Sequence, residues 1–195
     1  MMRKAVFLDR DGVLNKSIVR NAKPGSPSSL SELEFIDTSR QACRILGDAG
    51  YLLIGVTNQP DIARGKISRQ TIEQFNTMVK AEMSLDDLRL CPHDDDDGCS
   101  CRKPKPGMLV EAARSFDIDL STSIMVGDRW KDIEAGQAAG CRTVFIDYGY
   151  DEPRISLNFF PETFRFFYIT LRRTDCLFLL LNRFIHRFWK IIRLC

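Results

Sequence analysis

The sequence predicts an α/β fold, a doubly wound and mainly parallel β-sheet with helices on both faces. Short apolar runs recur along the chain, and a continuous apolar run suits a strand that is buried on both faces of a parallel sheet. Helical patterns separate these runs, and strands that alternate with helices form parallel sheets. Several runs end in polar residues, and open α/β sheets bind ligands at the carboxyl ends of their strands.

Length and charge limit what the chain can do. Its 195 residues suffice for one domain with a core, which we expect at residues 1–150, and a tail at residues 151–195. Of 28 basic and 26 acidic residues, the tail holds eight and four, which leaves 20 and 22 in residues 1–150. Because no basic field covers the main body, we expect no nucleic-acid partner.

The location predicted from the sequence is the cytoplasm. Residues 1–4 lead directly into an apolar run, without the apolar segment and cleavage site of a signal peptide. No apolar run reaches the ~18 residues of a transmembrane helix. Three of the seven cysteines lie within residues 91–101 beside a histidine, a pattern typical of metal binding in a reducing compartment.

The first buried strand, predicted at residues 5–8, ends in two carboxylates. Asp9 and Asp11 are one residue apart, and Gly12 follows them. Two acids at this spacing repel each other, and a divalent cation relieves the repulsion. The alternative is a polar turn that ends the strand.

A loop is expected over residues 16–31, because residues 24–29 form a turn cluster of proline, glycine and serine. This loop either crosses the mouth of the site and meets the substrate or is a plain surface loop. A helix is predicted over residues 38–49, and Gly50 ends it.

The second buried strand, residues 51–56, ends in Thr57, Asn58 and Gln59. A hydroxyl and an amide at the carboxyl end of a strand can hold a phosphate oxygen. An ordinary strand-end cap is the plainer interpretation.

A helix is predicted from about residue 68, followed by a short strand at residues 88–90. The predicted apolar face of this helix consists of Ile72, Phe75, Met78, Val79 and Met83.

Cys91, His93, Cys99 and Cys101 stand within eleven residues. Three thiolates and an imidazole this close together can form a tetrahedral Zn²⁺ site, with residues 94–98 as a loop whose ends the metal joins. The alternatives are buried free cysteines and a redox pair. Since protein ligands fill all four positions, the predicted site is structural and has no place for a catalytic water.

Arg102 and Lys103 directly follow Cys101, and two prolines come soon after them. The prolines and the metal loop would hold both side chains in fixed positions. There an ammonium can neutralise a transferring phosphoryl group, and a guanidinium can bind a second oxyanion. A solvated basic patch is the plainer interpretation. A helix over residues 107–116 comes next.

A further carboxylate, Asp128, follows the strand predicted at residues 124–126. It is the natural third acidic group for the predicted cation. Asp132 falls in the first turn of the next helix, where it could orient its neighbours. That helix ends at Gly140, and a fifth strand is predicted at residues 143–146.

Four segments together resemble the four motifs of the haloacid dehalogenase (HAD) superfamily of phosphotransferases. They are Asp9-Arg10-Asp11-Gly12, Thr57-Asn58-Gln59, Lys103, and Gly127-Asp128 with Asp132. The cysteine-rich segment is similar to the zinc-loop branch, subfamily IIIA, which holds D-glycero-D-manno-heptose 1,7-bisphosphate phosphatases and histidinol-phosphate phosphatases. Residues 57–65 and 105–108 resemble the heptose enzymes more. The resemblance covers about residues 3–150.

The resemblance implies a HAD fold without a large cap domain and a Mg²⁺-dependent phosphatase that acts through an aspartyl-phosphate. The implied substrate is a small phosphorylated sugar, D-glycero-D-manno-heptose 1,7-bisphosphate first, and the implied state is a monomer. Asp9 would be the nucleophile, and Asp11 the general acid and base. Mg²⁺ would be held by Asp9, the backbone carbonyl of Asp11, and Asp128.

The remaining implied roles concern the substrate. Thr57 and Lys103 would steady the phosphoryl oxygens. The substrate-binding residues would be Asn58, Gln59, Arg102 and Arg129.

Two other functions stay open from the sequence. One is hydrolysis of histidinol phosphate or another small phosphomonoester. The other, of a different class, is a catalytically silent interaction module that is held together by zinc and brought to membranes by its tail.

The tail differs from the rest of the chain. It contains eight of the thirteen phenylalanines, and polar residues recur every three or four positions over residues 176–195, which predicts an amphipathic helix with a basic face. One interpretation is weak contact with a membrane surface or a partner, and another is packing against the sheet. A third interpretation, which we rank first, is that the segment is foreign to the family, for instance the product of a shifted reading frame.

Overall fold

The computed structural model describes residues 2–20, 22–151 and 170–172. Its main strands are β1 (Ala5–Leu8), β4 (Leu52–Asn58), β5 (Asp87–Cys91), β6 (Ile124–Gly127), β7 (Arg142–Asp147) and β8 (Thr170–Arg172). Its α-helices are α1 (Asp37–Asp48), α2 (Arg69–Glu82), α3 (Gly107–Phe116) and α4 (Trp130–Ala138). The predicted strands and helices of residues 1–150 are confirmed, with ends that differ by a few residues.

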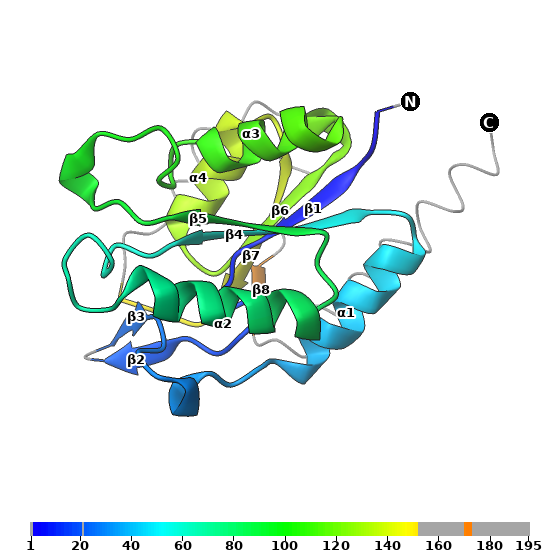
Figure 1. Ribbon diagram of the computed structural model, residues 1–195. Helices are drawn as coiled ribbons and strands as arrows, with labels where there is room; N and C mark the ends of the chain where they lie inside the picture. Colours follow the sequence, from blue (N-terminus) through cyan, green and yellow to red (C-terminus); the bar gives the residue numbers. More distant parts are fainter. Residues whose placement is uncertain (1, 21, 152–169, 173–195) are drawn as a thin grey trace, which may run out of the picture.

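The strands form one parallel sheet in the order β5-β4-β1-β6-β7-β8 (Figure 1). The strand order reverses at β1, since the chain proceeds outward through β4 and β5 on one side and through β6 and β7 on the other. This reversal makes the sheet doubly wound and leaves a crevice at the carboxyl end of β1. The described residues contain no separate cap domain.

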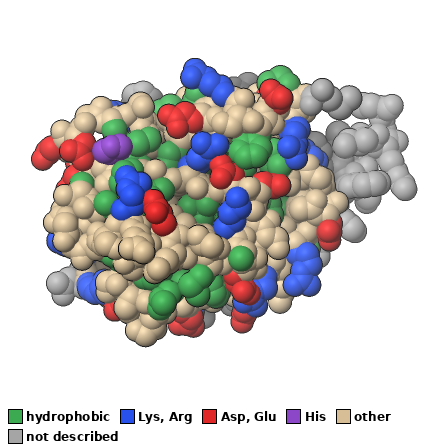
Figure 2. All heavy atoms as spheres, in the orientation of Figure 1, with side chains coloured by type: hydrophobic (Ala, Val, Ile, Leu, Met, Phe, Trp, Pro, Cys, Tyr) green, Lys and Arg blue, Asp and Glu red, His purple; other side chains and the backbone are tan. Residues whose placement is uncertain are grey.

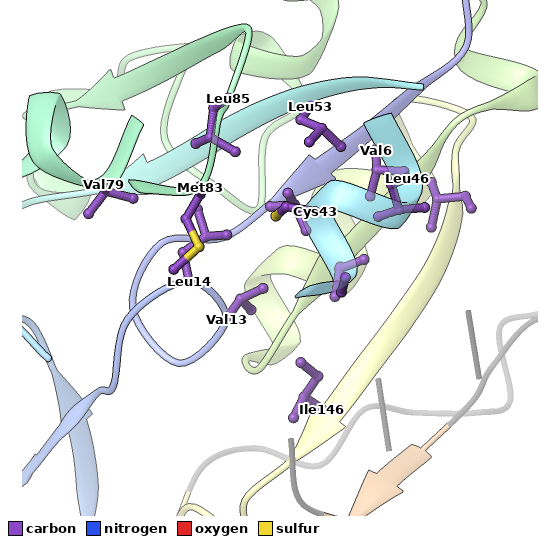
Figure 3. Close-up of a cluster of buried hydrophobic side chains, with 14 residues drawn as sticks. Val6, Val13, Leu14, Cys43, Leu46, Leu53, Val79, Met83, Leu85 and Ile146 are labelled. Carbon is purple, nitrogen blue, oxygen red and sulfur yellow. The ribbon is translucent and has the colours of Figure 1, made fainter. Parts of the chain in front are cut away.

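β1 is completely buried because both faces of the sheet are covered. Its side chains alternate between the two cores, as the two-residue period of a strand requires. Val6 and Leu8 pack in the core beneath α1 and α2, which Figure 3 shows in close-up, and Ala5 and Phe7 pack in the core beneath α3 and α4. The continuous apolar run of the sequence has this cause.

The register of the central strands brings their carboxyl ends together. Leu8 pairs with Gly55 of β4 and with Val126 of β6. The residues that follow these three positions therefore meet at one edge of the sheet. In Figure 1 the loop between β5 and α3 extends on this side of the molecule, at the left of the view.

The expected loop over residues 16–31 is only partly a loop. β2 (Ile18–Arg20) and β3 (Lys23–Gly25) form an antiparallel hairpin. Its turn contains Ala22 with a φ of 59°. The hairpin could not be predicted from this residue, because alanine rarely takes the left-handed conformation and so gives no turn signal.

The buried face of α2 differs from the prediction at one residue. Met78, predicted on the buried face of α2, is 43% exposed, because α2 buries a narrower stripe at Ile72, Phe75 and Val79.

The predicted helix at residues 176–195 lies outside the described residues. Within the described part of the chain, no helix has the length and apolar character needed to cross a membrane.

The charged surface agrees with the nearly balanced charge of residues 1–150. On the face shown in Figure 2, basic and acidic side chains are interspersed among neutral ones. Such a surface presents no extended field of one sign on that face.

Candidate active site

Three carboxylates meet at the carboxyl edge of the sheet. Asp9 follows β1, Asp128 follows β6, and Asp132 lies in the first turn of α4. One oxygen from each lies within 4.8 Å of the other two, and all three residues are buried. The backbone N–H of Asp9 donates to the carbonyl of Val126 (3.0 Å), which fixes the end of β1 beside β6.

This carboxylate cluster fits a divalent cation. Burial and the charge of Asp132 raise the pKa of Asp9 to about 7, and burial and the charge of Asp9 raise the pKa of Asp128 well above its usual value. Carboxylates so placed need a cation if they are to be ionised together. Oδ1 of Asp128 is buried and has no hydrogen-bond partner among the described residues, which suits an atom that faces a metal. Oxygen ligands of this kind are typical of Mg²⁺ sites.

Gly12 lets the loop after β1 approach Asp128 closely. Its φ is +89°, and a Cβ at this position would lie 1.9 Å from Oδ2 of Asp128. The Ser17 hydroxyl donates to the same oxygen (3.5 Å), and Tyr150 hydrogen-bonds the carboxylate. The Tyr148 hydroxyl donates to the Gly12 carbonyl (3.0 Å). These hydroxyl residues were not predicted as part of the site, since no sequence motif connects them with the loop.

Lys103 reaches the carboxylates from the segment after the cysteine-rich loop. Its ammonium donates to Oδ1 of Asp9 (2.8 Å) and to the carbonyl of Val56 (2.8 Å), and it pairs with Asp132 (2.6 Å). These contacts use the three N–H donors of an ammonium. Burial opposes the charge, but Asp132 and Asp9 outweigh it and raise the pKa of Lys103 above its usual value. The group therefore stays cationic beside Asp9.

Two of the polar residues at the end of β4, Thr57 and Asn58, line the cleft, and the amides of Asn58 and Gln59 hold neighbouring groups. Thr57 is buried and lines the cleft described below. The Asn58 amide donates to the Lys103 carbonyl (3.0 Å) and accepts from its N–H (3.1 Å). The Gln59 amide donates to Oδ2 of Asp11 and to Oγ1 of Thr57, both at 2.8 Å. Both amides therefore contact neighbouring site residues.

Asp11 is held by Arg10, a residue absent from the predicted site. Arg10 is fully buried and donates to both oxygens of Asp11 through Nε (3.1 Å) and Nη2 (2.9 Å), while Nη1 donates to Asn76 of α2 (2.8 Å). Asn15 (2.9 Å) and Ser26 (2.8 Å) also donate to this carboxylate. Burial alone would raise the pKa of Asp11, but Arg10 and these hydrogen bonds hold it below its usual value.

The four predicted zinc ligands come together between β5 and α3. Sγ of Cys91 lies 3.6 Å from Nδ1 of His93, 3.8 Å from Sγ of Cys99 and 3.2 Å from Sγ of Cys101. A tetrahedron of thiolates about 2.3 Å from Zn²⁺ has edges of about 3.8 Å, so the arrangement is compatible with a closed zinc site. The three thiols are free.

An acidic residue of the zinc loop (residues 91–101) binds two basic side chains. Oδ1 of Asp95 accepts from Nε of Arg102 (2.8 Å) and from Nζ of Lys131 (3.2 Å). Arg102 also donates to the carbonyl of His93 (3.0 Å). The Arg102 guanidinium is therefore nearly buried and pairs with residues of the loop.

A cleft opens above these groups and encloses about 430 Å³ of empty space, part of it open to solvent. The lining residues are Asp9, Asp11, Ser17, Pro24, Gly25, Ser26, Thr57, Asn58, Lys103, Arg129, Lys131 and Asp132. The β2–β3 hairpin therefore reaches the mouth of the cleft, in line with the first of the two interpretations of residues 16–31. Gln59, Asp128 and Arg102 are not among the lining residues.

Comparisons with known proteins agree with this geometry. Residues 100–162 match a family model described as HAD-hydrolase-like. The chain is 39% identical over 160 residues to D-glycero-beta-D-manno-heptose-1,7-bisphosphate 7-phosphatase of Pasteurella multocida, covering 76% of this chain and 84% of that protein. It is 37% identical over 156 residues to D-glycero-alpha-D-manno-heptose-1,7-bisphosphate 7-phosphatase of Campylobacter jejuni, covering 75% and 83%.

A solved structure is also similar. The crystal structure of D,D-heptose 1,7-bisphosphate phosphatase from B. bronchiseptica, complexed with magnesium and phosphate, superimposes with a TM-score of 0.75 at 29% identity. The match covers 94% of this chain and 99% of that one.

Proposed function

The chain belongs to the D-glycero-D-manno-heptose-1,7-bisphosphate 7-phosphatase family of HAD-like hydrolases, and we propose that it removes the phosphate on carbon 7 of a heptose 1,7-bisphosphate. It is a magnesium-dependent phosphatase. One observation carries the proposal for this site. Asp9, Lys103 and Asp132 converge within hydrogen-bond distance at the floor of the cleft, beside Asp128. Phosphoryl transfer depends mainly on such positioning and charge neutralisation.

Asp9 is the nucleophile in this proposal. One of its oxygens attacks the phosphorus, the bond between phosphorus and the sugar oxygen breaks, and an aspartyl-phosphate forms. Lys103, held beside Asp9, neutralises negative charge on the phosphoryl oxygens. The Thr57 hydroxyl at the cleft wall donates to one of those oxygens.

Asp11 gives and then takes a proton. In the first step its protonated form delivers the proton to the leaving sugar oxygen. In the second step the ionised form removes a proton from the water that attacks the aspartyl-phosphate, which releases phosphate and restores Asp9. The pairing with Arg10 favours the ionised form, as the second step needs. For the first step the carboxyl must exchange one of its contacts, and the Ser26 hydroxyl at the cleft mouth is the accessible one.

Mg²⁺ fits Asp9, Asp128 and the backbone carbonyl of Asp11, because other donors occupy the Asp11 side chain. When bound, the cation neutralises the carboxylates and the transferring phosphoryl group. Asp132 has a different role. Its oxygens accept from Lys103 and from the N–H of Arg129 (3.0 Å), so it orients both residues.

Zn²⁺ in the four-ligand site is structural. It holds the start of the segment that carries Arg102 and Lys103, and Asn58 holds the backbone of Lys103 from the other side. Arg129, which lines the cleft, binds the substrate beyond its reacting phosphate, whereas Arg102 does not line the cleft and pairs with Asp95 of the zinc loop.

The proposed catalytic unit is residues 1–150, a monomer of the cytoplasm. Every residue with a role above lies in that range. The proposal assigns no role to residues 151–195.

The test is hydrolysis by the full chain, loaded with zinc and supplied with Mg²⁺. Both anomers of D-glycero-D-manno-heptose 1,7-bisphosphate are offered, and ³¹P NMR identifies the phosphate that is released. We expect loss of the carbon-7 phosphate. A higher kcat/KM for histidinol phosphate would contradict the substrate, and failure to hydrolyse any phosphomonoester would contradict the function.

A further inference from the structure

Two lysines that line the cleft, Lys103 and Lys131, differ in burial and in their contacts. Lys103 lies at the floor, with 3% of its side chain exposed and each of its three donors engaged. Lys131 lies at the rim, with 20% of its side chain exposed. A phosphoryl group on Asp9 falls within reach of the first cation, so the second faces a more distant part of the substrate.

The contacts of Lys131 hold it without burying it. Its Nζ lies 3.2 Å from Oδ1 of Asp95 and 5.5 Å from the centre of the Trp130 ring. The Asp95 side chain is 60% exposed. A salt bridge with a solvated carboxylate contributes little, so an incoming dianion can compete for this ammonium.

Asp95 also sets the place of Lys131 relative to the zinc loop. The same oxygen accepts from Nε of Arg102 at 2.8 Å. The two cationic nitrogens therefore lie no more than 6.0 Å apart, the sum of the two distances to that oxygen. Both cations pair with the Asp95 carboxylate, and Arg102 also pairs with Asp94 (3.8 Å), so of the two cations only Lys131 lines the cleft.

We infer that Lys131 is a specificity-determining residue that binds the non-reacting phosphate of a sugar bisphosphate, and that Asp95 is the positioning residue that holds it over the cleft. The inference rests on the proposed function, because it presumes that the other phosphate reacts at Asp9. A phosphate offers several oxygens to one ammonium, and a close ion pair of this kind improves binding more than it speeds the chemical step.

The experiment compares two substrates that differ only in the second phosphate, heptose 1,7-bisphosphate and heptose 7-phosphate. For Lys131→Gln we expect KM for the bisphosphate to rise about five- to tenfold with kcat within about twofold, and KM for the monophosphate to stay unchanged. Lys131→Arg keeps the positive charge and should therefore have a KM for the bisphosphate close to that of the wild type. Inhibition by heptose 1-phosphate, which carries the second phosphate alone, should weaken by a similar factor in Lys131→Gln.

Asp95→Asn tests the positioning role. It should raise KM for the bisphosphate by about two- to threefold and leave the monophosphate unaffected, because the lysine remains but loses its anchor. Lys80→Gln, an exposed change of the same charge on α2, is the matched control and should alter neither KM.

The outcomes separate this inference from the proposed function. Equal effects of Lys131→Gln on both substrates, or no effect on either, would overturn the inference and leave the phosphatase activity standing. A wild-type protein that hydrolyses neither substrate would remove the proposed function, and the inference with it.

Discussion

The two proposed metal sites of this molecule are assembled in opposite ways. The zinc ligands all come from residues 91–101, so their spacing along the chain is enough to bring them together. The carboxylate cluster joins Asp9 to Asp128 and Asp132, over a hundred positions further along, through the parallel pairing of β1 and β6. The first site depends on a loop, and the second depends on the whole sheet. Substitutions in the carboxylate cluster should therefore leave the zinc loop intact, whereas disruption of the zinc loop should weaken the carboxylate site only through Arg102 and Lys103, and the following predictions test that.

The largest effect is expected at the nucleophile. Asp9→Asn should lower kcat by about 10⁴-fold or more, because an amide cannot form the acyl phosphate. Zinc content, measured by atomic emission, should stay at the wild-type level, since the loop does not depend on this side chain.

Asp48→Asn, at an exposed position of α1, is the matched control and should keep full activity. Loss of zinc in Asp9→Asn would show that the two sites are coupled and would contradict the comparison.

The next largest effect is expected for Arg10→Gln. Glutamine cannot replace the paired guanidinium contact, so Asp11 is left as a buried charge without its main partner. Breaking a buried pair in this way costs about 3–5 kcal/mol in the free energy of unfolding. We also expect kcat to fall by about 10²-fold, because Asp11 is the proposed acid and base.

Chemical denaturation and steady-state kinetics measure these two effects. The exposed Arg44→Gln of α1 serves as the control, with stability within about 0.5 kcal/mol of wild type. An Arg10→Gln protein of normal stability would show that Asp11 does not need its partner.

A smaller effect on activity is expected when the zinc loop is disrupted. Cys99→Ala removes one of four ligands, so zinc should be lost and kcat/KM should fall by about 10- to 100-fold as Arg102 and Lys103 lose their fixed start. Residual activity is expected because the carboxylate cluster is built elsewhere.

Ser100→Ala, between two ligands, keeps all four metal donors and should retain zinc and activity. If Cys99→Ala were as inactive as Asp9→Asn, the zinc loop would be part of the catalytic centre itself.

The smallest effect concerns stability and pH. In the protein without Mg²⁺, the pKa of Asp9 is raised to about 7, above the ordinary 3.8. The folded state then binds more protons than the unfolded state between these values, so the free energy of unfolding should fall as pH rises through this interval. Mg²⁺ binds the ionised carboxylates, so the increase in Tm that Mg²⁺ causes should become larger as pH rises through the same interval. Each kcal/mol of added stability corresponds to about 2–4 °C in Tm for a chain of this length.

Thermal unfolding of the zinc-loaded protein at about pH 5 and about pH 8, with and without Mg²⁺, measures this trend. In Asp9→Asn the contribution of Asp9 to the pH dependence should vanish. A Mg²⁺ effect that is larger at the lower pH would contradict the assigned cause.

The same contrast explains what the sequence could and could not predict. Apolar runs and helical periods located the strands and helices because both faces of the sheet are covered. The Cys/His cluster of the proposed zinc site was readable from spacing alone. Asp9, Asp128 and Lys103 were predictable because strand ends meet at one edge, and the family motifs singled out these residues.

Other site residues carry no such signal. Arg10 stands between two acids and gives no sign that it is the fully buried partner of Asp11. Asp95 lies in an acidic run that resembles an ordinary solvated loop, and its contact with Lys131 joins residues 36 positions apart. Tyr150 meets Asp128 only because the chain folds back after β7. Pairings between loops depend on side-chain directions that periodicity does not encode.

Gly12 has a consequence for the genetics of this chain. Oδ2 of Asp128 occupies the space that a side chain at position 12 would need, since a Cβ there would lie 1.9 Å from this oxygen. A single base change that turns this codon into alanine would displace the carboxylate while every chemical group of the enzyme remained. In a survey of natural or random variants, a position without a side chain should tolerate as little change as the nucleophile three residues before it.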